Sequence, residues 1–473
     1  MTEPLWTAPA AIAAMEGTSD RQDWSASGIS IDSRTVVPGD LFVAIVGPHF
    51  DGHSFVAAAL EAGAVAAVVT ARPDDVPADA ALVIVDDTLR AIERLGRAAR
   101  ARTDARVIAV TGSVGKTGTK EALRNILSCY GETHANPGSF NNHWGLPLTL
   151  ARMPQSTEFA VLELGMNHTG ELGPLSRMAR PHVALITTIA SNHIGNFASL
   201  DEIADAKAEV FEGLEPDGWA ILNQDDGYRD RLAAAAERLG AGHIISFGRE
   251  KGANLRLLHC DLKPDSCRVT ADIGGLPLTW DVGCAGGHWA MNSLGIMAVI
   301  QALSLNFRQA TGALKEMQPP AGRGQRSVIS LPDGTAELID DSYNASPVSM
   351  RAAFDVLKVA APGTDGRRIA VLGDMLELGD QAESEHRALA DELLGRDIDL
   401  VFTCGPLMRS CSRALPDTVR GGHSPDSRSL APRLVGVIAP GDVVLVKGSY
   451  GSRMSVVVDL LKNLNMPVAA MGG

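Results

Sequence analysis

The chain has 473 residues, of which 45% are hydrophobic and 21% charged, and its 42 basic and 56 acidic side chains give a formal net charge of −14. These values are typical of folded globular proteins and exclude a disordered or fibrous chain. At roughly 150 residues per domain, the length predicts about three domains. No run of Lys and Arg appears, so we expect no nucleic-acid partner.

The cysteines and the N-terminal segment predict the compartment. The six cysteines are scattered without a Cys-x-x-Cys pair, which argues against a disulfide framework and a zinc ribbon. The first residues carry an early acid, Glu3, and no basic stretch, so we expect no signal peptide. No stretch reaches about 18 apolar residues in a row, and we therefore expect no membrane span and a cytoplasmic enzyme.

The first region, residues 1–104, mixes short strands with an α/β unit. Residues 54–62 carry apolar side chains at helical spacing and stop at Gly63, and residues 65–69 form an apolar run typical of a strand. A second helix is predicted over residues 89–102. This pattern predicts a small N-terminal α/β domain.

The second region, residues 105–320, begins with a short buried strand, a glycine-rich turn and a helix over about residues 117–129. Further apolar runs, each followed by turn or helical sequence, are at 159–164, 183–189 and 219–223. Strands that alternate with helices at this spacing predict a doubly wound parallel sheet. Residues 255–282 alternate like antiparallel strands, and we expect them to form a side sheet.

The third region, residues 321–473, follows a Pro- and Gly-rich segment at 319–324 that we interpret as a hinge. It again contains apolar runs before turns, at 337–339, 369–372, 400–403 and 443–446. We therefore predict a second, Rossmann-like α/β domain here. The fold class is thus α/β, with three domains.

The strongest local signal for chemistry is the segment Val110-Thr-Gly-Ser-Val-Gly-Lys-Thr117, between a strand and a helix. A loop with little side-chain bulk lets backbone N–H groups and a helix N-terminus converge on a phosphate. Lys116 would then reach the β- and γ-phosphates, and the Thr117 hydroxyl would bind Mg²⁺. Val110 stands where the strict Walker pattern has glycine, so the loop is a shortened one. The alternative is a glycine-rich turn with a surface lysine.

Three further residues follow predicted strands or lie on the next helix. Glu163 ends an apolar strand, where a carboxylate suits Mg²⁺, although it could instead cap the next helix. His193 follows the next strand, at the edge where open α/β sheets bind ligands, but a lone histidine there is more often structural. Lys207 lies on a predicted helix with acids at i−2 and i+2, and by itself it indicates a solvated surface lysine.

The second half of the chain adds three more candidates. Asn292 opens a predicted apolar helix over residues 292–303, where it could be an N-cap. Arg323, on the hinge, could reach a phosphate when domains close, or form a salt bridge at the rim. Asp341 begins a polar loop that ends at Pro347, a pattern typical of a ligand-lining loop or of a plain turn.

Together these segments resemble the Mur ligase family, the ATP-dependent amide-forming enzymes of peptidoglycan synthesis. The resemblance runs through all three regions. It is carried, in chain order, by the short phosphate loop, Glu163, His193, Lys207, Asn292, Arg323 and Asp341.

Three stretches indicate which member of the family the chain resembles. Residues 31–44 look like the uridine-binding N-terminal domain shared by the members that add the third residue and the terminal D-alanyl-D-alanine; the earlier-acting ligases begin with a Gly-x-Gly-x-x-Gly domain, which is absent here. Residues 140–150 and 341–347 are similar to the dipeptide-adding member. The family loop usually reads Asn-Ala-Asn-Pro, and Ser346 replaces its second Asn.

The alternatives lack their own signatures. The member that adds the third residue, diaminopimelate or lysine, would show Tyr-Ala-His-x-Pro and often Asp-Asn-Pro-Arg. Folylpolyglutamate synthase, a distant relative, would show Ala-His-Asn-Pro. Neither set is found. A non-catalytic nucleotide-binding module is the rival from another class, and it would have no need of a second metal site.

The resemblance implies that UDP-N-acetylmuramoyl-tripeptide and D-alanyl-D-alanine are joined at the expense of ATP, with two Mg²⁺ ions, in a chain that works as a monomer. Thr117 and Glu163 would hold one ion, and His193 and a carbamylated Lys207 the other; Lys116 and Arg323 would neutralise the transferring phosphoryl group. The implied nucleotide-binding residues are Gly112, Ser113, Val114, Gly115, Lys116, Thr117, Asn292, Arg323 and Asp341. The implied substrate-binding residues are Ser33, Arg34, Asn141, Asn142, Tyr343 and Asn344.

Overall fold

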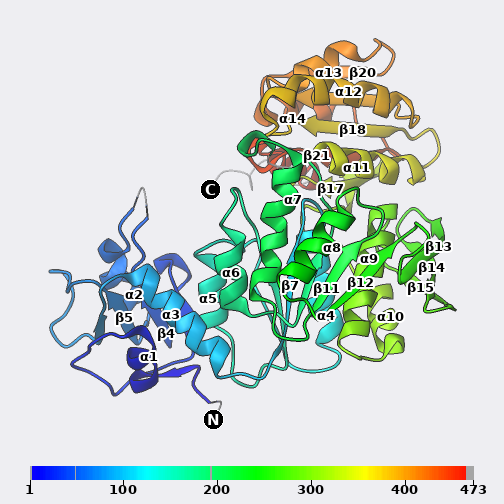
Figure 1. Cartoon of the computed structure of the whole chain (residues 1–473). Coiled ribbons are helices and arrows are strands. Elements are labelled where there is room, and N and C mark those ends of the chain that lie inside the picture. Colours follow the sequence, from blue (N-terminus) through cyan, green and yellow to red (C-terminus); the bar gives the residue numbers. More distant parts are fainter. Residues whose placement is uncertain (1–2, 48–49, 192–193, 465–473) are drawn as a thin grey trace.

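The computed structural model describes residues 3–47, 50–191 and 194–464 and contains three α/β units that follow one another along the chain (Figure 1). The predicted α/β fold class is confirmed, because each unit is a largely parallel sheet with helices packed against it. In Figure 1 the first unit stands apart from the other two, and the third lies over one end of the second.

The first unit is built on a four-stranded parallel sheet in the order β3-β4-β5-β6. Its strands are β3 (Gly28–Ser30), β4 (Asp40–Val43), β5 (Ala66–Val69) and β6 (Leu82–Ile84), and β1 (Trp6–Thr7) and β2 (Ser25–Ala26) form a separate antiparallel pair. Its helices are α1 (Ala8–Met15), α2 (Val56–Glu61) and α3 (Thr88–Ala101). The predicted helix over 54–62 is in fact a 3₁₀ turn, Gly52–Phe55, followed by the short α2.

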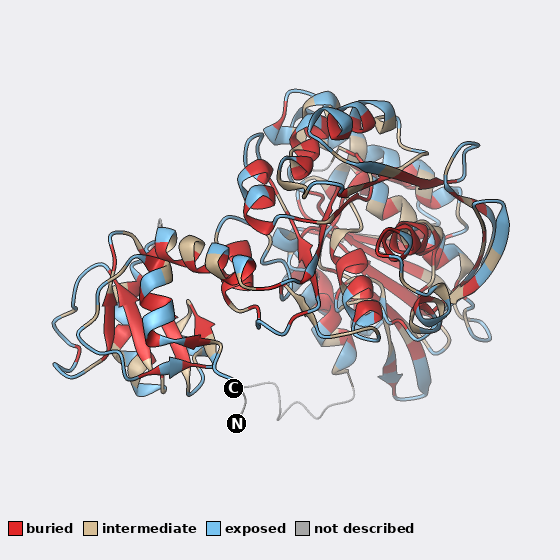
Figure 2. Ribbon diagram, turned by 60° about the horizontal axis from the view of Figure 1, so that its bottom comes forward, coloured by how far each residue is buried: buried red, intermediate tan, exposed pale blue. Residues whose placement is uncertain are grey.

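Helix α3 attaches the first unit to the second by packing against α5 (Gly145–Ala151). Gly96 permits this close approach, since a Cβ there would lie 2.9 Å from the carbonyl oxygen of Pro147. Leu148 and Ala151 of α5 belong to the hydrophobic core of the first unit. The two units therefore share buried side chains, and Figure 2 shows buried residues, in red, on the helices that join them.

The second unit contains a nine-stranded sheet in the order β15-β14-β13-β12-β11-β10-β7-β9-β8. The parallel part comprises β7 (Arg106–Thr111), β8 (Thr133–Ala135), β9 (Phe159–Glu163), β10 (Val183–Ile186), β11 (Trp219–Asn223), β12 (His243–Gly248) and β13 (Leu255–Leu262). Strands β14 (Cys267–Ile273) and β15 (Leu276–Val282) are antiparallel, as predicted, but they extend the main sheet through β13 and do not form a separate one.

Two hydrophobic cores fill the two faces of this sheet. One is covered by α4 (Lys116–Leu127), α9 (Gly287–Ala302) and α10 (Phe307–Lys315), and the other by α5, α6 (Leu172–Ala179), α7 (Leu200–Ala208) and α8 (Arg229–Arg238). The predicted start of a helix at Asn292 is wrong. Helix α9 begins five residues earlier because Gly286, with φ +110°, serves as its N-cap, so Asn292 lies inside the helix and is not a cap.

The third unit has a six-stranded sheet in the order β16-β17-β21-β18-β19-β20, in which only β16 is antiparallel. Its strands are β16 (Gln325–Leu331), β17 (Gly334–Asp341), β18 (Arg368–Gly373), β19 (Leu400–Cys404), β20 (Arg420–Ser424) and β21 (Val443–Lys447). Its helices are α11 (Pro347–Val359), α12 (Ala382–Leu394), α13 (Met408–Ala414), α14 (Ser427–Val435) and α15 (Ser455–Lys462). Every apolar run predicted as a strand in this region lies in one of these strands.

Candidate active site

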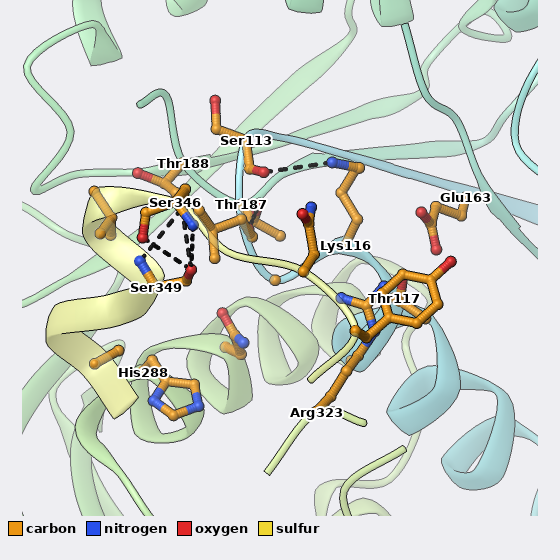
Figure 3. Close-up of a pocket in the computed structure, with 18 of the residues that line it drawn as sticks. Ser113, Lys116, Thr117, Glu163, Thr187, Thr188, His288, Arg323, Ser346 and Ser349 are labelled. Carbon is orange, nitrogen blue, oxygen red and sulfur yellow. Dashed lines mark hydrogen bonds between the residues drawn. The ribbon is translucent and has the colours of Figure 1, made fainter. Parts of the chain in front are cut away.

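A cavity of about 460 Å³ lies where the carboxyl ends of the second and third sheets face each other (Figure 3). Ligands bind at this edge in open α/β sheets because loops and helix N-termini converge there. Most of the residues singled out from the sequence line it: Ser113, Val114, Gly115, Lys116, Thr117, Asn141, Glu163, Lys207, Asn292, Arg323, Asp341, Tyr343 and Asn344.

The loop between β7 and α4 has the geometry of a phosphate cradle. Gly112 and Gly115 adopt φ +138° and +89°, and a Cβ on Gly112 would lie 2.0 Å from Oγ1 of Thr187. Ser113 ties the loop to the chain after β10, because its Oγ donates to the Ala190 carbonyl at 3.0 Å and accepts from the Ala190 amide. The two glycines therefore permit the backbone conformation of the loop, and Ser113 anchors it to the segment after β10.

Lys116 is folded back on this loop, where its Nζ donates to the Gly112 carbonyl at 2.7 Å. Burial lowers the pKa of Lys116, an effect partly opposed by the nearby Glu163 carboxylate. A polyanion in the cavity would favour the charged form of this ammonium. The structure thus places a cation beside converging N–H groups, which is the requirement for binding phosphate, and the glycine-rich turn with a surface lysine is not what the chain forms.

Glu163 is buried at the end of β9, and only one of its carboxylate oxygens is hydrogen-bonded. Oε1 accepts from the side-chain amide of Asn141 at 2.7 Å, whereas Oε2 is buried and has no hydrogen-bond partner among the described residues. It does not cap α6, whose first amides bond to Glu209. A buried, unpaired carboxylate oxygen in the cavity that Thr117 also lines suits a hard cation such as Mg²⁺.

The described part of the chain contains no cluster of three or more His, Cys, Asp and Glu side chains able to hold a metal by themselves. A cation here would therefore depend on Glu163, Thr117 and the oxygens of a bound phosphate, which is how Mg²⁺ is commonly held beside nucleotides. His193, expected from the resemblance to hold a second ion, lies outside the described residues.

Lys207 is not the solvated lysine that its local sequence indicates, since only 3% of it is exposed. Its acidic neighbours point elsewhere: Asp205 pairs with Arg231 at 2.7 Å, and Glu209 accepts three backbone N–H groups from residues 170–173. Burial, reinforced by the charge of Lys116, lowers the pKa of Lys207 well below 10.5. The hydrogen bonds of the described residues include none to its amine, which lines the cavity, and burial there favours its uncharged form.

The third unit contributes Asp341 and Lys447, which are directly paired in register on β17 and β21. Lys447 Nζ lies 2.7 Å from Asp341 Oδ2 and also donates to the Asn344 carbonyl at 2.9 Å. Burial raises the pKa of Asp341 although Lys447 opposes the shift. His288, on the facing helix α9, has a pKa lowered to about 4 by burial and by Lys447, so it is neutral at physiological pH.

Arg323 and Tyr343 lie at the boundary between the second and third units. The guanidinium of Arg323 lies 4.3 Å from the centre of the Tyr343 ring, and the described residues offer it no ion pair. The Tyr343 hydroxyl lies 2.8 Å from Oγ of Ser139, which belongs to the second unit. Arg323 therefore keeps an unneutralised charge beside the cavity, and the alternative of a rim salt bridge is wrong for the described residues.

Four of the expected residues that the structure describes do not line the cavity. Gly112 belongs to the phosphate loop but packs against Thr187, and Asn142 uses its Oδ1 to accept from the Gly145 amide at the start of α5. Ser33 and Arg34 lie in the first unit, in a 3₁₀ turn that is capped by Asp32, whose side chain accepts from the Arg34 amide. The Arg34 side chain is 86% exposed and pairs with Asp32 at 2.7 Å.

The cavity also contains residues that were not expected from the sequence, among them Lys447, His288, Asn167, Thr187 and Ser349. Lys447 had a signal, because it directly follows the apolar run 443–446. Ser346 and Ser349 form a capping box at the start of α11, each side chain bonding to the backbone amide of the other.

No helix in the described ranges is long and apolar enough to cross a membrane.

Comparisons with known proteins agree with this geometry. Three family models match: the Mur ligase family, catalytic domain over residues 25–103, the Mur ligase middle domain over 110–300, and the Mur ligase, glutamate ligase domain over 322–450. The chain is 34% identical to the UDP-N-acetylmuramoyl-tripeptide–D-alanyl-D-alanine ligase of Bacillus subtilis, over 92% of this chain and 93% of that protein.

Solved structures show the same similarity. MurF from Acinetobacter baumannii superposes with a TM-score of 0.84 at 32% identity, covering 97% of this chain and 99% of that one. MurF ligase from Thermotoga maritima, solved in complex with ADP, superposes with a TM-score of 0.75 at 26% identity, covering 92% and 97%. This chain belongs to the Mur ligase family.

Proposed function

We propose that the chain is the ATP-dependent ligase that joins D-alanyl-D-alanine to UDP-N-acetylmuramoyl-tripeptide, giving the UDP-linked pentapeptide for peptidoglycan synthesis. The observation that carries the proposal is one cavity lined by the phosphate loop, by Glu163 with its unpartnered Oε2, by the buried Lys207 and by Arg323. The expected division into a UDP-substrate-binding domain (residues 1–104), an ATP-binding ligase domain (105–320) and a C-terminal Rossmann-like domain (321–473) is part of this proposal.

In the reaction, the terminal carboxylate of the tripeptide attacks the γ-phosphorus of ATP, so that an acyl phosphate forms and ADP leaves. The amine of D-alanyl-D-alanine then attacks the acyl carbon, loses a proton, and expels phosphate. The first step brings two anions together, so the site must supply positive charge. Lys116 and Arg323 are the cations placed to neutralise the transferring phosphoryl group, and donors fixed before the reaction stabilise it without reorganisation.

Thr117 and Glu163 would hold one Mg²⁺, and Lys207 would contribute to a second site together with His193. When bound, Mg²⁺ neutralises charge on the phosphates. Lys207 could bind Mg²⁺ only after carbamylation, in which its unprotonated amine adds to CO₂ and releases a proton. The burial and lowered pKa of Lys207 support this modification, because only the unprotonated amine reacts and because a buried ammonium would repel a cation. Asn292 and Asp341 are proposed contacts to the nucleoside, and Ser33 and Arg34 to the uridine diphosphate.

The experiment is phosphate release from ATP with UDP-N-acetylmuramoyl-tripeptide, with and without D-alanyl-D-alanine, with mass spectrometry of the product. Release that depends on the dipeptide, and a product heavier by one dipeptide unit, would establish the reaction. Turnover only with the UDP-dipeptide and a single diamino acid would instead identify the member that adds the third residue. We propose that the enzyme acts in the cytoplasm, as expected for a reaction that consumes ATP, and as a monomer.

A further inference from the structure

A second lysine, Lys120, lies one helical turn after Lys116 on α4 and is completely buried. Its Nζ donates to two backbone carbonyls in the loop that follows β8, those of Asn136 at 2.8 Å and Gly138 at 3.2 Å. Its third partner is the carboxylate of Glu121, so its charge is balanced within its own helix. Because burying an ammonium is costly unless every proton is bonded, this arrangement indicates a specific structural task.

The loop that Lys120 holds is locked to Glu163 through Asn136, which is 1% exposed. The side chain of Asn136 bonds to both backbone groups of Glu163: Oδ1 accepts from its amide at 2.8 Å, and Nδ2 donates to its carbonyl at 3.2 Å. Nδ2 also donates to the Phe140 carbonyl at 3.1 Å. One amide side chain thus fixes the end of β9 and both ends of a short loop.

That loop carries two groups that act at the cavity. Asn141 donates to Oε1 of Glu163 at 2.7 Å, which leaves Oε2 as the free oxygen. Ser139 contacts the Tyr343 hydroxyl of the third unit at 2.8 Å. The orientation of the Glu163 carboxylate therefore depends on where the loop from 136 to 141 is held.

We infer that Lys120 and Asn136 are positioning residues, which hold this loop so that Asn141 presents Oε2 of Glu163 to the cation bound with the nucleotide. The inference rests on the proposed function, since it presumes that Mg²⁺ enters with ATP. Lys120 acts through geometry and not through its charge, because Glu121 neutralises it and its protons point at carbonyl oxygens. Asn136 acts likewise, by fixing the backbone of Glu163.

The test measures nucleotide affinity and not turnover. The Kd of a non-hydrolysable ATP analogue is determined by calorimetry in MgCl₂ and again in EDTA. The proteins compared are the full-length wild type and the variants Lys120→Met and Asn136→Ala. Removing a group that orients a metal ligand typically weakens metal affinity by about 10- to 100-fold. We therefore expect both variants to lose most of the Mg²⁺-dependent gain in affinity while their Kd in EDTA changes less than about twofold.

Two controls make the result specific. Arg124→Ala removes the second cation bonded to Glu121 (Arg124 Nε to Oε2, 2.8 Å) and leaves the loop unchanged. This variant should keep the full Mg²⁺-dependent gain in affinity for the ATP analogue. Lys120→Arg retains the positive charge and the N–H donors, and should recover part of the Mg²⁺-dependent gain in affinity that Lys120→Met loses. A purely structural role would lower the melting temperature and weaken binding equally in both buffers, which would contradict the inference.

The outcomes separate this inference from the proposed function. Variants that keep the unchanged Mg²⁺-dependent gain would overturn the inference. A wild-type chain that binds no ATP analogue, or binds it equally well in EDTA, would overturn the proposed function. If Lys120→Met does not fold, Asn136→Ala carries the test, because it removes the bonds to Glu163 and leaves the buried Lys120–Glu121 pair in place.

Discussion

Lys447 and Asp341 lie side by side on β21 and β17 and form an ion pair of 2.7 Å at the wall of the cavity. The Lys447 side chain is 2% exposed, so the attraction is little screened by solvent. Removing one partner of such a pair leaves an uncompensated buried charge. The pair therefore couples the stability of the third unit to the protonation state of Asp341.

We predict that Lys447→Met lowers the free energy of unfolding by about 3 kcal/mol or more, the usual cost of breaking a buried pair from one side. The pKa of Asp341, already raised by burial, should rise further, so that the carboxylate is lost as an acceptor for the nucleotide. Urea denaturation and the Kd for ADP measure the two effects. The matched control is Lys462→Met, because Lys462 lies 3.5 Å from Asp340 but is 36% exposed, and its loss should cost about 1 kcal/mol or less.

For Lys207, function and stability should change in opposite directions. Lys207→Met should abolish dipeptide-dependent phosphate release, yet keep or raise the melting temperature, since an apolar side chain replaces a buried amine. The pH dependence follows from the lowered pKa. Between the folded pKa and 10.5 the unfolded chain binds the extra proton, so wild-type stability in CO₂-free buffer should rise with pH across this window.

Lys207→Met should lack that rise, as thermal melts over the pH series would show. Bicarbonate should increase the activity of the wild-type enzyme and leave the variant inactive. Activity that is indifferent to the removal of CO₂ would contradict a role for the carbamate.

Gly112→Ala tests the packing of the phosphate loop. The new Cβ would lie 2.0 Å from Oγ1 of Thr187 in a backbone conformation of φ +138°, so we expect loss of nucleotide binding and a large drop in melting temperature. Gly240→Ala is the control, because Gly240 has φ +90° but no atom within 4 Å of the new Cβ. It should show only the strain of a positive φ, roughly 1–2 kcal/mol. Equal destabilisation in the two variants would contradict the steric explanation.

Ser346→Ala tests the role of the residue that departs from the family loop. Loss of the capping box at α11 should lower stability by about 1 kcal/mol. Ser346→Asn should be close to wild type, since Asn is an equally good N-cap. Denaturant melts measure both. A KM for ATP that rises more than about tenfold in Ser346→Ala, with stability unchanged, would instead assign Ser346 to direct nucleotide contact.

Sequence patterns predicted most of the elements because their causes are local. The central strands of the second and third units, such as β7, β10, β18 and β21, contain continuous apolar runs. The phosphate loop is recognisable because glycines, a lysine and a helix start must occur within a few residues. The start of α9 could not be predicted, because Gly286 is compatible with either a loop or a cap, and the backbone angle that decides between them depends on packing. Similarly, the alternation of β13–β15 predicted their antiparallel pairing but not which sheet they would join.

Local sequence was misleading where burial decides the chemistry. Lys207 has the flanking acids of a surface lysine, yet residues at i±2 lie on opposite sides of a helix, and the tertiary fold engages those acids elsewhere. Lys447 and Asp341 are 106 residues apart, and only the strand order β17-β21-β18 makes them neighbours. The sequence by itself determined the three α/β units, the phosphate loop and the residue types that reach the carboxyl edges of the strands. Only the tertiary structure decided which of these side chains are buried from solvent and which form hydrogen bonds or ion pairs, because desolvation and pairing depend on atoms that are distant in the chain.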